Sequence, residues 1–235
     1  MIGKQKVIAI IPARGGSKRL PRKNVLNLAG KPLISWTIDA AKECKYIDEI
    51  LVSTDDREIS NIALQHGVHM PELRPSHLSS DSATTESLLL YCLEQYEIDA
   101  NIIVLLQPTS PLRSALDIEK SLEYYIEKSA KSVVTVTQCE HSPLWANILP
   151  EDFNMGRFIP EKNTKRSQEL PVFYRLNGAI YIFDIDTFKV CGMKYSKDSY
   201  AYLMDNESSI DIDTELDFKF ADFLLNERVS YYAKS

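Results

Sequence analysis

Short apolar runs rich in β-branched residues alternate with segments of helical spacing along most of the chain. A continuous apolar run of this kind is typical of a strand that is buried on both faces of a parallel sheet. The predicted strands span 7–13, 49–54, 101–106, 132–137 and 178–183. The predicted helices span 33–44, 55–66, 82–97, 115–129 and 214–228. This alternation predicts a three-layer α/β fold with a mostly parallel sheet and right-handed crossovers.

The alternation stops at residues 141–176. This stretch holds short apolar clusters joined by polar connections, and it has no clear period. A structureless loop of that length is uncommon inside a compact domain, so we expect an inserted arm, a small β-lobe that acts as a lid or in dimer contact. A symmetric partner is the commonest cover for exposed apolar side chains, so a homodimer is predicted. The apolar side chains concerned are Leu144, Trp145, Ile148, Phe153, Phe158 and Ile159.

Composition narrows the function and the location. The 235 residues carry a net charge of −6, which argues against a nucleic-acid partner because such binding needs a broad basic surface. No apolar run is long enough for a membrane span or a signal peptide, so no membrane partner is expected. The four cysteines lack metal-binding or redox spacing. We therefore expect a single domain over 1–235 in a reducing, cytoplasmic compartment.

A basic segment with two glycines, residues 13–24, directly follows the first predicted strand. Open α/β sheets bind ligands at this carboxyl edge, and glycines let backbone N–H groups approach phosphate oxygens. The glycine spacing fits neither a P-loop nor a dinucleotide-binding fingerprint. The alternative is a solvated basic turn, but the position after a buried strand favours a site for a small anionic substrate.

Five segments, in order along the chain, resemble the acylneuraminate cytidylyltransferases, the CMP-sialic acid synthetases. They cover most of the sequence, so the resemblance does not depend on a single motif. It implies a Rossmann-like nucleotidyltransferase fold and a transfer of CMP from CTP to an acidic nine-carbon sugar. The segments are 13–24, Arg74-Pro75 with Asp81-Ser-Ala-Thr-Thr85, Leu105-Leu-Gln-Pro-Thr-Ser-Pro-Leu-Arg113, Tyr174-Arg-Leu-Asn-Gly-Ala-Ile-Tyr181 and Ser209-Ile-Asp-Ile-Asp-Thr-Glu-Leu-Asp217.

The resemblance implies roles at the nucleotide. The cations of the basic segment would hold the phosphates and stabilise the transition state at the α-phosphorus. Taken alone, Arg74 would be an ordinary surface arginine. The implied catalytic residues are Arg14, Lys18 and Lys23, and the implied nucleotide-binding residues are Gly15, Gly16, Ser17, Asn24, Arg74 and Thr85.

A second group of residues is assigned to the sugar. Gln107 and Thr109 follow a buried strand in a turn stiffened by prolines, although the segment could instead be only a strand-terminating turn. The resemblance implies that Arg175 and Asn177 contact the sugar carboxylate and hydroxyls, and an arginine fork suits a carboxylate. The family often has a further arginine where this chain has Ser167, so Arg166 is the substitute.

Asp211 and Asp213 alternate along a predicted extended segment, so both carboxylates face one side. Two hard oxygen ligands suit Mg²⁺, which takes its remaining ligands from phosphate and water. The alternative is that Asp213 caps the last helix, whose N-cap pair is predicted at Thr214 and Asp217.

The expected function is thus a magnesium-dependent cytidylyltransferase that acts on CTP and a nonulosonic acid. A CMP-Kdo-type or other sugar nucleotidyltransferase stays open, as does a non-catalytic nucleotide-binding regulator. Sequence does not choose among N-acetylneuraminic, legionaminic and pseudaminic acids. The aromatic element in 141–147 favours a bacterial diacylamino sugar such as legionaminic acid.

Overall fold

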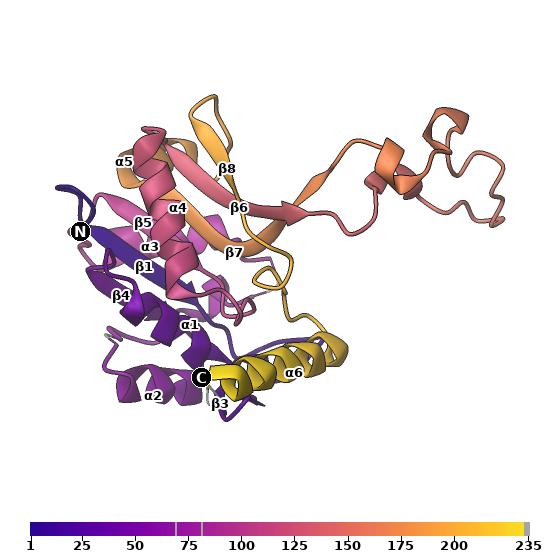
Figure 1. The fold of residues 1–235 in the computed structure, drawn as a ribbon. Helices are drawn as coiled ribbons and strands as arrows, with labels where there is room; N and C mark the ends of the chain where they lie inside the picture. The colour runs from indigo at the N-terminus through magenta and orange to yellow at the C-terminus, as the bar shows by residue number, and fades with distance from the viewer. Residues whose placement is uncertain (69, 81, 233–235) are drawn as a thin grey trace.

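A six-stranded mixed sheet forms the centre of the computed structural model, which describes residues 1–68, 70–80 and 82–232 (Figure 1). Within this sheet, β7 runs antiparallel to both neighbours and the other described pairings are parallel. The predicted mostly parallel α/β sheet is therefore confirmed. Its strands, in spatial order, are β4 (Glu49–Ser53), β1 (Val7–Pro12), β5 (Ile102–Leu106), β7 (Tyr174–Asp184), β6 (Ser132–Gln138) and β8 (Ser199–Leu203).

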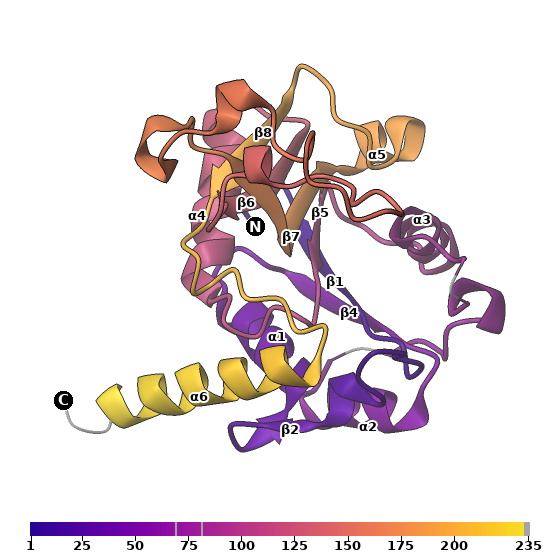
Figure 2. The same ribbon diagram turned by 90° about the vertical axis from the view of Figure 1, so that its right-hand side faces the viewer.

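Helices cover both faces of this sheet and give the predicted three layers (Figure 2). Ile38, Ile59 and Leu122 belong to a core cluster that packs helices of one layer against the strands. Leu89 and Phe188 belong to the cluster on the opposite face. The first layer holds α1 (Leu33–Glu43), α2 (Arg57–Gln65) and α4 (Ala115–Glu127), and the second holds α3 (Thr85–Gln95) and α5 (Ile185–Cys191).

Side-chain caps fix where several helices begin. Asp56 accepts from the backbone N–H groups of Glu58 and Ile59, which starts α2. The predicted Thr214–Asp217 pair is confirmed: Asp217 N donates to Thr214 Oγ1 at 3.3 Å, and Thr214 N donates to Asp217 Oδ2 at 2.7 Å. This pair starts α6 (Glu215–Tyr232), which packs beside the short hairpin of β2 (Asn27–Leu28) and β3 (Lys31–Pro32).

The segment after β6 projects away from the sheet as an arm (Figure 1). The expectation of a small β-lobe is wrong: residues 141–173, all of which are described, contain single-turn 3-10 helices and no strand. Residues 174–176 belong to β7. Local turns supply the arm's order, together with a hydrogen bond from Trp145 Nε1 to Asn163 O at 3.1 Å. The helical turns are η3 (Pro143–Trp145), η4 (Glu161–Asn163) and η5 (Ser167–Glu169).

Two further expectations concern cysteines and membranes. All four cysteines are free; Cys44 and Cys92 are buried in the core and Cys191 is exposed. Within the described ranges, no helix combines the length and the apolar character that a membrane span requires.

Candidate active site

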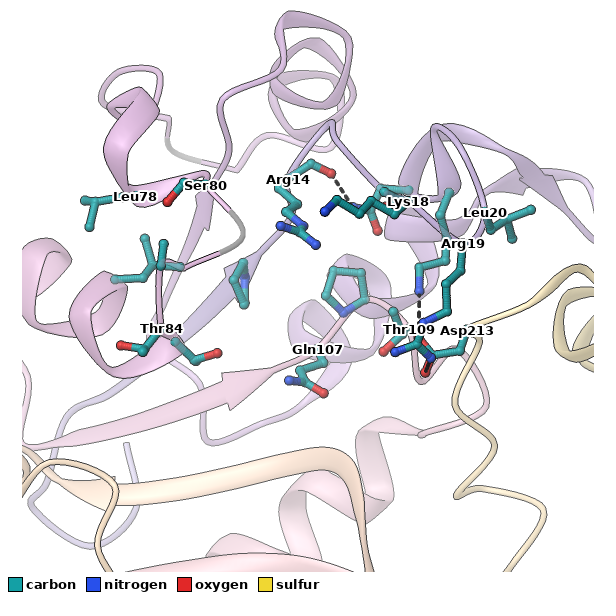
Figure 3. Close-up of a pocket in the computed structure, with 18 of the residues that line it drawn as sticks. Arg14, Lys18, Arg19, Leu20, Leu78, Ser80, Thr84, Gln107, Thr109 and Asp213 are labelled. Atoms are coloured by element: carbon teal, nitrogen blue, oxygen red, sulfur yellow. Dashed lines mark hydrogen bonds and ion pairs between the residues drawn. The ribbon is translucent and has the colours of Figure 1, made fainter. Parts of the chain in front are cut away.

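A pocket of about 570 Å³ opens at the carboxyl ends of β1 and β5. Parallel α/β sheets place their ligand sites at this edge. Four chain segments contribute to its wall (Figure 3). Two of them are the basic loop after β1 and the turn after β5. The others are described residues between Arg74 and the start of α3, and the extended segment that precedes α6. The predicted residues that line it are Arg14, Ser17, Lys18, Lys23, Asn24, Arg74, Thr85, Gln107, Thr109, Asp211 and Asp213.

The two glycines of the basic loop lie outside the pocket lining. Gly15 N donates to Asp55 Oδ1 at 2.9 Å, and a Cβ on Gly15 would stand 2.7 Å from Asp56 Oδ2. Glycine is therefore required there for close packing against the loop that follows β4. A Cβ on Gly16 would meet nothing within 4 Å, so packing does not explain that glycine.

Two residues that line the pocket, Asn24 and Arg74, each have a buried polar atom with no hydrogen-bond partner among the described residues. Asn24 donates from Nδ2 to Arg14 O at 3.0 Å, but its Oδ1 is unsatisfied. Arg74 donates from Nε to Ser79 Oγ at 3.1 Å, while its buried Nη2 is unsatisfied and lies 3.7 Å from Asp55 Oδ1. Burial lowers the pKa of Arg74, and Asp55 opposes that shift. Leaving such groups unpaired is costly, so they mark a place where a ligand fits.

The start of α3 forms the wall of the pocket opposite the basic loop. Thr84 is the N-cap, and its side chain accepts from Ser87 N at 3.0 Å. Thr85 is the first helical residue and lines the pocket with its neighbour. A helix N-terminus carries partial positive charge, which suits an electron-rich ligand group.

Gln107 and Thr109 lie on the turn that forms the floor of the pocket, with Gln107 below Arg14 in Figure 3. A Cβ at Gly178 would stand 2.8 Å from Gln107 Oε1, so the glutamine side chain lies directly over that glycine. Thr109 O accepts from Ile212 N at 2.8 Å. This bond fixes the aspartate segment against the turn.

Asp211 and Asp213 both line the pocket, as their alternation predicts. The side chain of Asp211 is open to solvent, yet the surrounding walls desolvate it and raise its pKa, which a hydrogen bond from Thr109 partly offsets. Asp213 accepts from Arg19 Nη1 at 2.5 Å and lies 3.5 Å from Lys23 Nζ. Since Thr214 caps α6, the capping alternative for Asp213 is wrong.

Three predicted sugar residues are not among the residues that line the pocket. Arg166 is exposed on the arm, and Arg175 is exposed near the start of β7. Asn177 is buried: its Oδ1 accepts from Thr135 Oγ1 at 2.6 Å and its Nδ2 donates to Ser209 Oγ at 2.9 Å. Asn177 therefore ties β7 to the segment that carries Asp211.

Sequence reasoning gave no separate role to two arginines. Arg19 lines the pocket beside Asp213. The sequence indicated it only as one of the cations of the basic loop. Arg113 is fully buried beneath the floor, where Nη1 donates to the carbonyls of Gln107 and Ala179, each at 3.2 Å. Burial lowers the pKa of Arg113 to about 10. Arg113 ends one of the five matching segments, but sequence reasoning assigned it no role, because its partners are backbone atoms that only the fold brings together.

Known proteins resemble this chain over nearly its whole length. An N-acylneuraminate cytidylyltransferase of Streptococcus agalactiae is 38% identical, and the match covers 95% of this chain and 55% of that protein. A CMP-N,N'-diacetyllegionaminic acid synthase of Legionella pneumophila is 36% identical, with 94% and 96% covered. The chain thus spans about half the length of the streptococcal relative.

The fold also matches a solved structure. A CMP:2-keto-3-deoxy-manno-octonic acid synthetase complexed with CTP superposes with a TM-score of 0.73 at 18% identity, over 95% of this chain and 99% of that chain. The model of the family described as cytidylyltransferase matches residues 8–154, which is more than half of the sequence. The chain belongs to the cytidylyltransferase family.

Proposed function

We propose that the protein transfers CMP from CTP to the anomeric hydroxyl of a nine-carbon, sialic-acid-like sugar acid and releases pyrophosphate. One observation carries the proposal. A single pocket collects a loop of cations, two carboxylates and two unsatisfied buried polar side chains, Asn24 and Arg74. The relatives named for the same reaction on such acids support it.

We propose that Asn24 and Arg74 recognise the cytosine base and that Thr85 contacts the ribose. Asn24 Oδ1 is an acceptor and Arg74 Nη2 is a donor, and both are already held by other hydrogen bonds. Cytosine offers an amino donor beside acceptor atoms, so it can satisfy both groups. Because these side chains are ordered before the base arrives, little conformational entropy is lost on binding.

The basic loop is the proposed phosphate site. Arg14, Lys18 and Lys23 line one side of the pocket, and Lys23 is held by a hydrogen bond to Ile212 O. The sugar hydroxyl oxygen attacks the α-phosphorus, the bond from that phosphorus to the β-phosphate bridge breaks, and pyrophosphate and a proton leave. Fixed cations stabilise the charge that develops on the departing oxygens.

Asp211 and Asp213 fit a magnesium ion. They supply hard oxygen ligands at the pocket, and the described residues contain no cluster of three or more metal-binding side chains. An ion held there must take its other ligands from phosphate and water, which is the usual state of Mg²⁺ in proteins. When bound, it would neutralise phosphate charge.

Gln107 and Thr109 are the proposed contacts of the sugar acid in the same pocket. Arg166 lies on the arm, which extends away from the chain's own sheet (Figure 1). We include a homodimer in the proposal, because the arm leaves Ile148 89% and Phe153 73% exposed and these side chains need cover. Within such a dimer, Arg166 and Arg175 would face a partner rather than their own pocket.

The proposal also covers the sugar class and the location. The 36% identity to the Legionella CMP-N,N'-diacetyllegionaminic acid synthase supports a diacylamino acid such as legionaminic acid. The free cysteines support a reducing, cytoplasmic location. Pseudaminic acid and N-acetylneuraminic acid are the competing nonulosonic acceptors.

Pyrophosphate release with CTP and Mg²⁺ tests the proposal. The acceptors are the three nonulosonic acids and, separately, the eight-carbon acid Kdo. Release that depends on a nonulosonic acid supports the proposal. Release with Kdo alone favours the Kdo-type alternative, and CTP binding without release from any acceptor favours the regulator.

A further inference from the structure

Both carboxylate oxygens of Asp213 lie beside cations of the basic loop. Arg19 Nη1 donates to Oδ2 at 2.5 Å, and Lys23 Nζ lies 3.5 Å from Oδ1 (Figure 3). The contact between Arg19 and Asp213 joins residues 194 positions apart in the sequence. Asp213 in this state is an ion-pair partner rather than an open metal ligand.

A divalent cation and a guanidinium cannot share the same carboxylate oxygen without repulsion. A metal that approaches Asp213 must therefore displace Arg19 or bind through fewer oxygens. The two loop cations differ in how easily they move. The side chain of Lys23 is 11% exposed and donates to Ile212 O, whereas that of Arg19 is 70% exposed. Arg19 is the partner that can leave.

A triphosphate in the pocket offers Arg19 a stronger partner. It carries several negative charges, and phosphate oxygens match a guanidinium fork as well as a carboxylate does. Arg19 lines the same pocket as the other loop cations, so it can reach a triphosphate held by them. A bound triphosphate would thus compete with Asp213 for the Arg19 side chain.

We propose that Arg19 gates the metal site: it holds Asp213 in the nucleotide-free protein and moves to the triphosphate when CTP binds, which frees Asp213 for the metal. This inference rests on the proposed function. It makes CTP and metal binding cooperative, and linkage requires that each ligand raise the affinity for the other by the same factor. This gate would prevent Asp211 and Asp213 from binding a metal ion before the nucleotide binds.

Mn²⁺ binding without any nucleotide, followed by electron paramagnetic resonance, tests the gate. Arg19→Ala should bind Mn²⁺ about tenfold more tightly than the parent, because Oδ2 of Asp213 no longer has a competing partner. The matched control is Arg22→Ala. Arg22 lies on the same loop with a half-exposed side chain, but it pairs with Glu58 and Asp56 outside the pocket. That control should leave Mn²⁺ affinity within twofold of the parent.

Asp213→Asn separates the inference from the proposed function. If Arg19→Ala binds Mn²⁺ no better than the parent while Asp213→Asn loses the ion, the gate is wrong and the metal site stands. If Asp213→Asn binds Mn²⁺ as the parent does, both the gate and the proposed metal site are wrong. Tighter binding in Arg19→Ala that the added Asp213→Asn change abolishes supports both.

Discussion

The side chain of Gln107 lies so close over Gly178 that a Cβ there would stand 2.8 Å from Gln107 Oε1. Gly178 also has φ +74°, a conformation that L side chains rarely adopt. Close approach and backbone conformation both require glycine at this position, which lies within β7 beside the floor of the pocket.

Gly178→Ala should therefore impair the sugar end of the pocket. The new methyl group displaces Gln107, so we expect the KM for the sugar acid to rise about tenfold or more while the KM for CTP changes little. The positive φ adds a loss of about 1–2 kcal/mol of stability. Steady-state kinetics with each substrate varied in turn measure the split.

Gly30→Ala is the matched control for that substitution. Gly30 has φ +94°, but a Cβ there would meet nothing within 4 Å. It should lose comparable stability and keep both KM values. Equal kinetic effects in the two variants would mean that strain, and not Gln107, causes the change.

Arg74→Met should weaken CTP binding by about 10- to 100-fold, because a charged hydrogen bond to the base is lost. Pyrophosphate affinity should stay within about twofold, since Arg74 is placed at the base and not at the phosphates. The change also removes the Nε hydrogen bond to Ser79 and the ion pair with Asp55, so a thermal melt checks that the variant is folded before the titration. Calorimetric titration with both ligands then measures the two affinities. Equal losses for CTP and pyrophosphate would contradict base reading.

Lys23→Ala should lower turnover about 100-fold or more, because a fixed cation at the reacting phosphate acts mainly on the transition state. The nearby Arg22→Ala variant controls for loss of loop charge and should keep its rate within a few-fold. Comparing kcat for the two variants is decisive. Parental turnover in Lys23→Ala would make this lysine a structural residue that only supports Ile212 O.

Asp213→Asn and Asp211→Asn should each raise the Mg²⁺ concentration needed for half-maximal rate and lower the maximal rate. Both residues line the pocket, and hard cations tolerate loss of a carboxylate charge poorly. The melting temperature should hardly change, because neither residue caps a helix. Thr214→Ala is the contrasting variant: it removes the cap of α6, costs about 1 kcal/mol and should leave the magnesium curve unchanged.

Light scattering at micromolar concentration should give the mass of a dimer. Ile148→Asp with Phe153→Asp should shift the mass toward the monomer, because both exposed side chains lie on the arm. Leu64→Asp, at an exposed leucine on α2 away from the arm, should leave the dimer intact. A monomeric parent would contradict the dimer.

The strands were predictable from sequence because each is a continuous apolar run that can only be buried. β1, β4 and β5 therefore match their predicted ranges within one residue. The reversed direction of β7 was not predictable, because the same apolar pattern suits either direction inside a covered sheet. β8 was missed because it is a short edge strand without a continuous apolar run. Only Tyr200 and Tyr202 pack against the core, while their neighbours are more exposed. The arm was wrongly predicted as a small β-lobe, because its apolar residues indicate that they are covered but do not indicate which structure covers them.

Much of the site was predictable because its polar residues directly follow buried strands, at the edge where ligands bind. Gln107, Thr109 and the basic loop were found in this way. The partners of individual side chains were not predictable. Asn177 bonds to Thr135 and Ser209, and Arg19 to Asp213, across separations that only the folded chain closes. Asp81, part of a matching motif, lies outside the described residues.

Mass spectrometry of the products formed from CTP and each nonulosonic acid shows whether the protein transfers CMP to the sugar. We expect one CMP-sugar for each pyrophosphate released, formed with at least one of the three acids and lost when Mg²⁺ is removed. Turnover of CTP without a CMP-sugar, or a CMP-sugar formed only from Kdo, would contradict the proposed function.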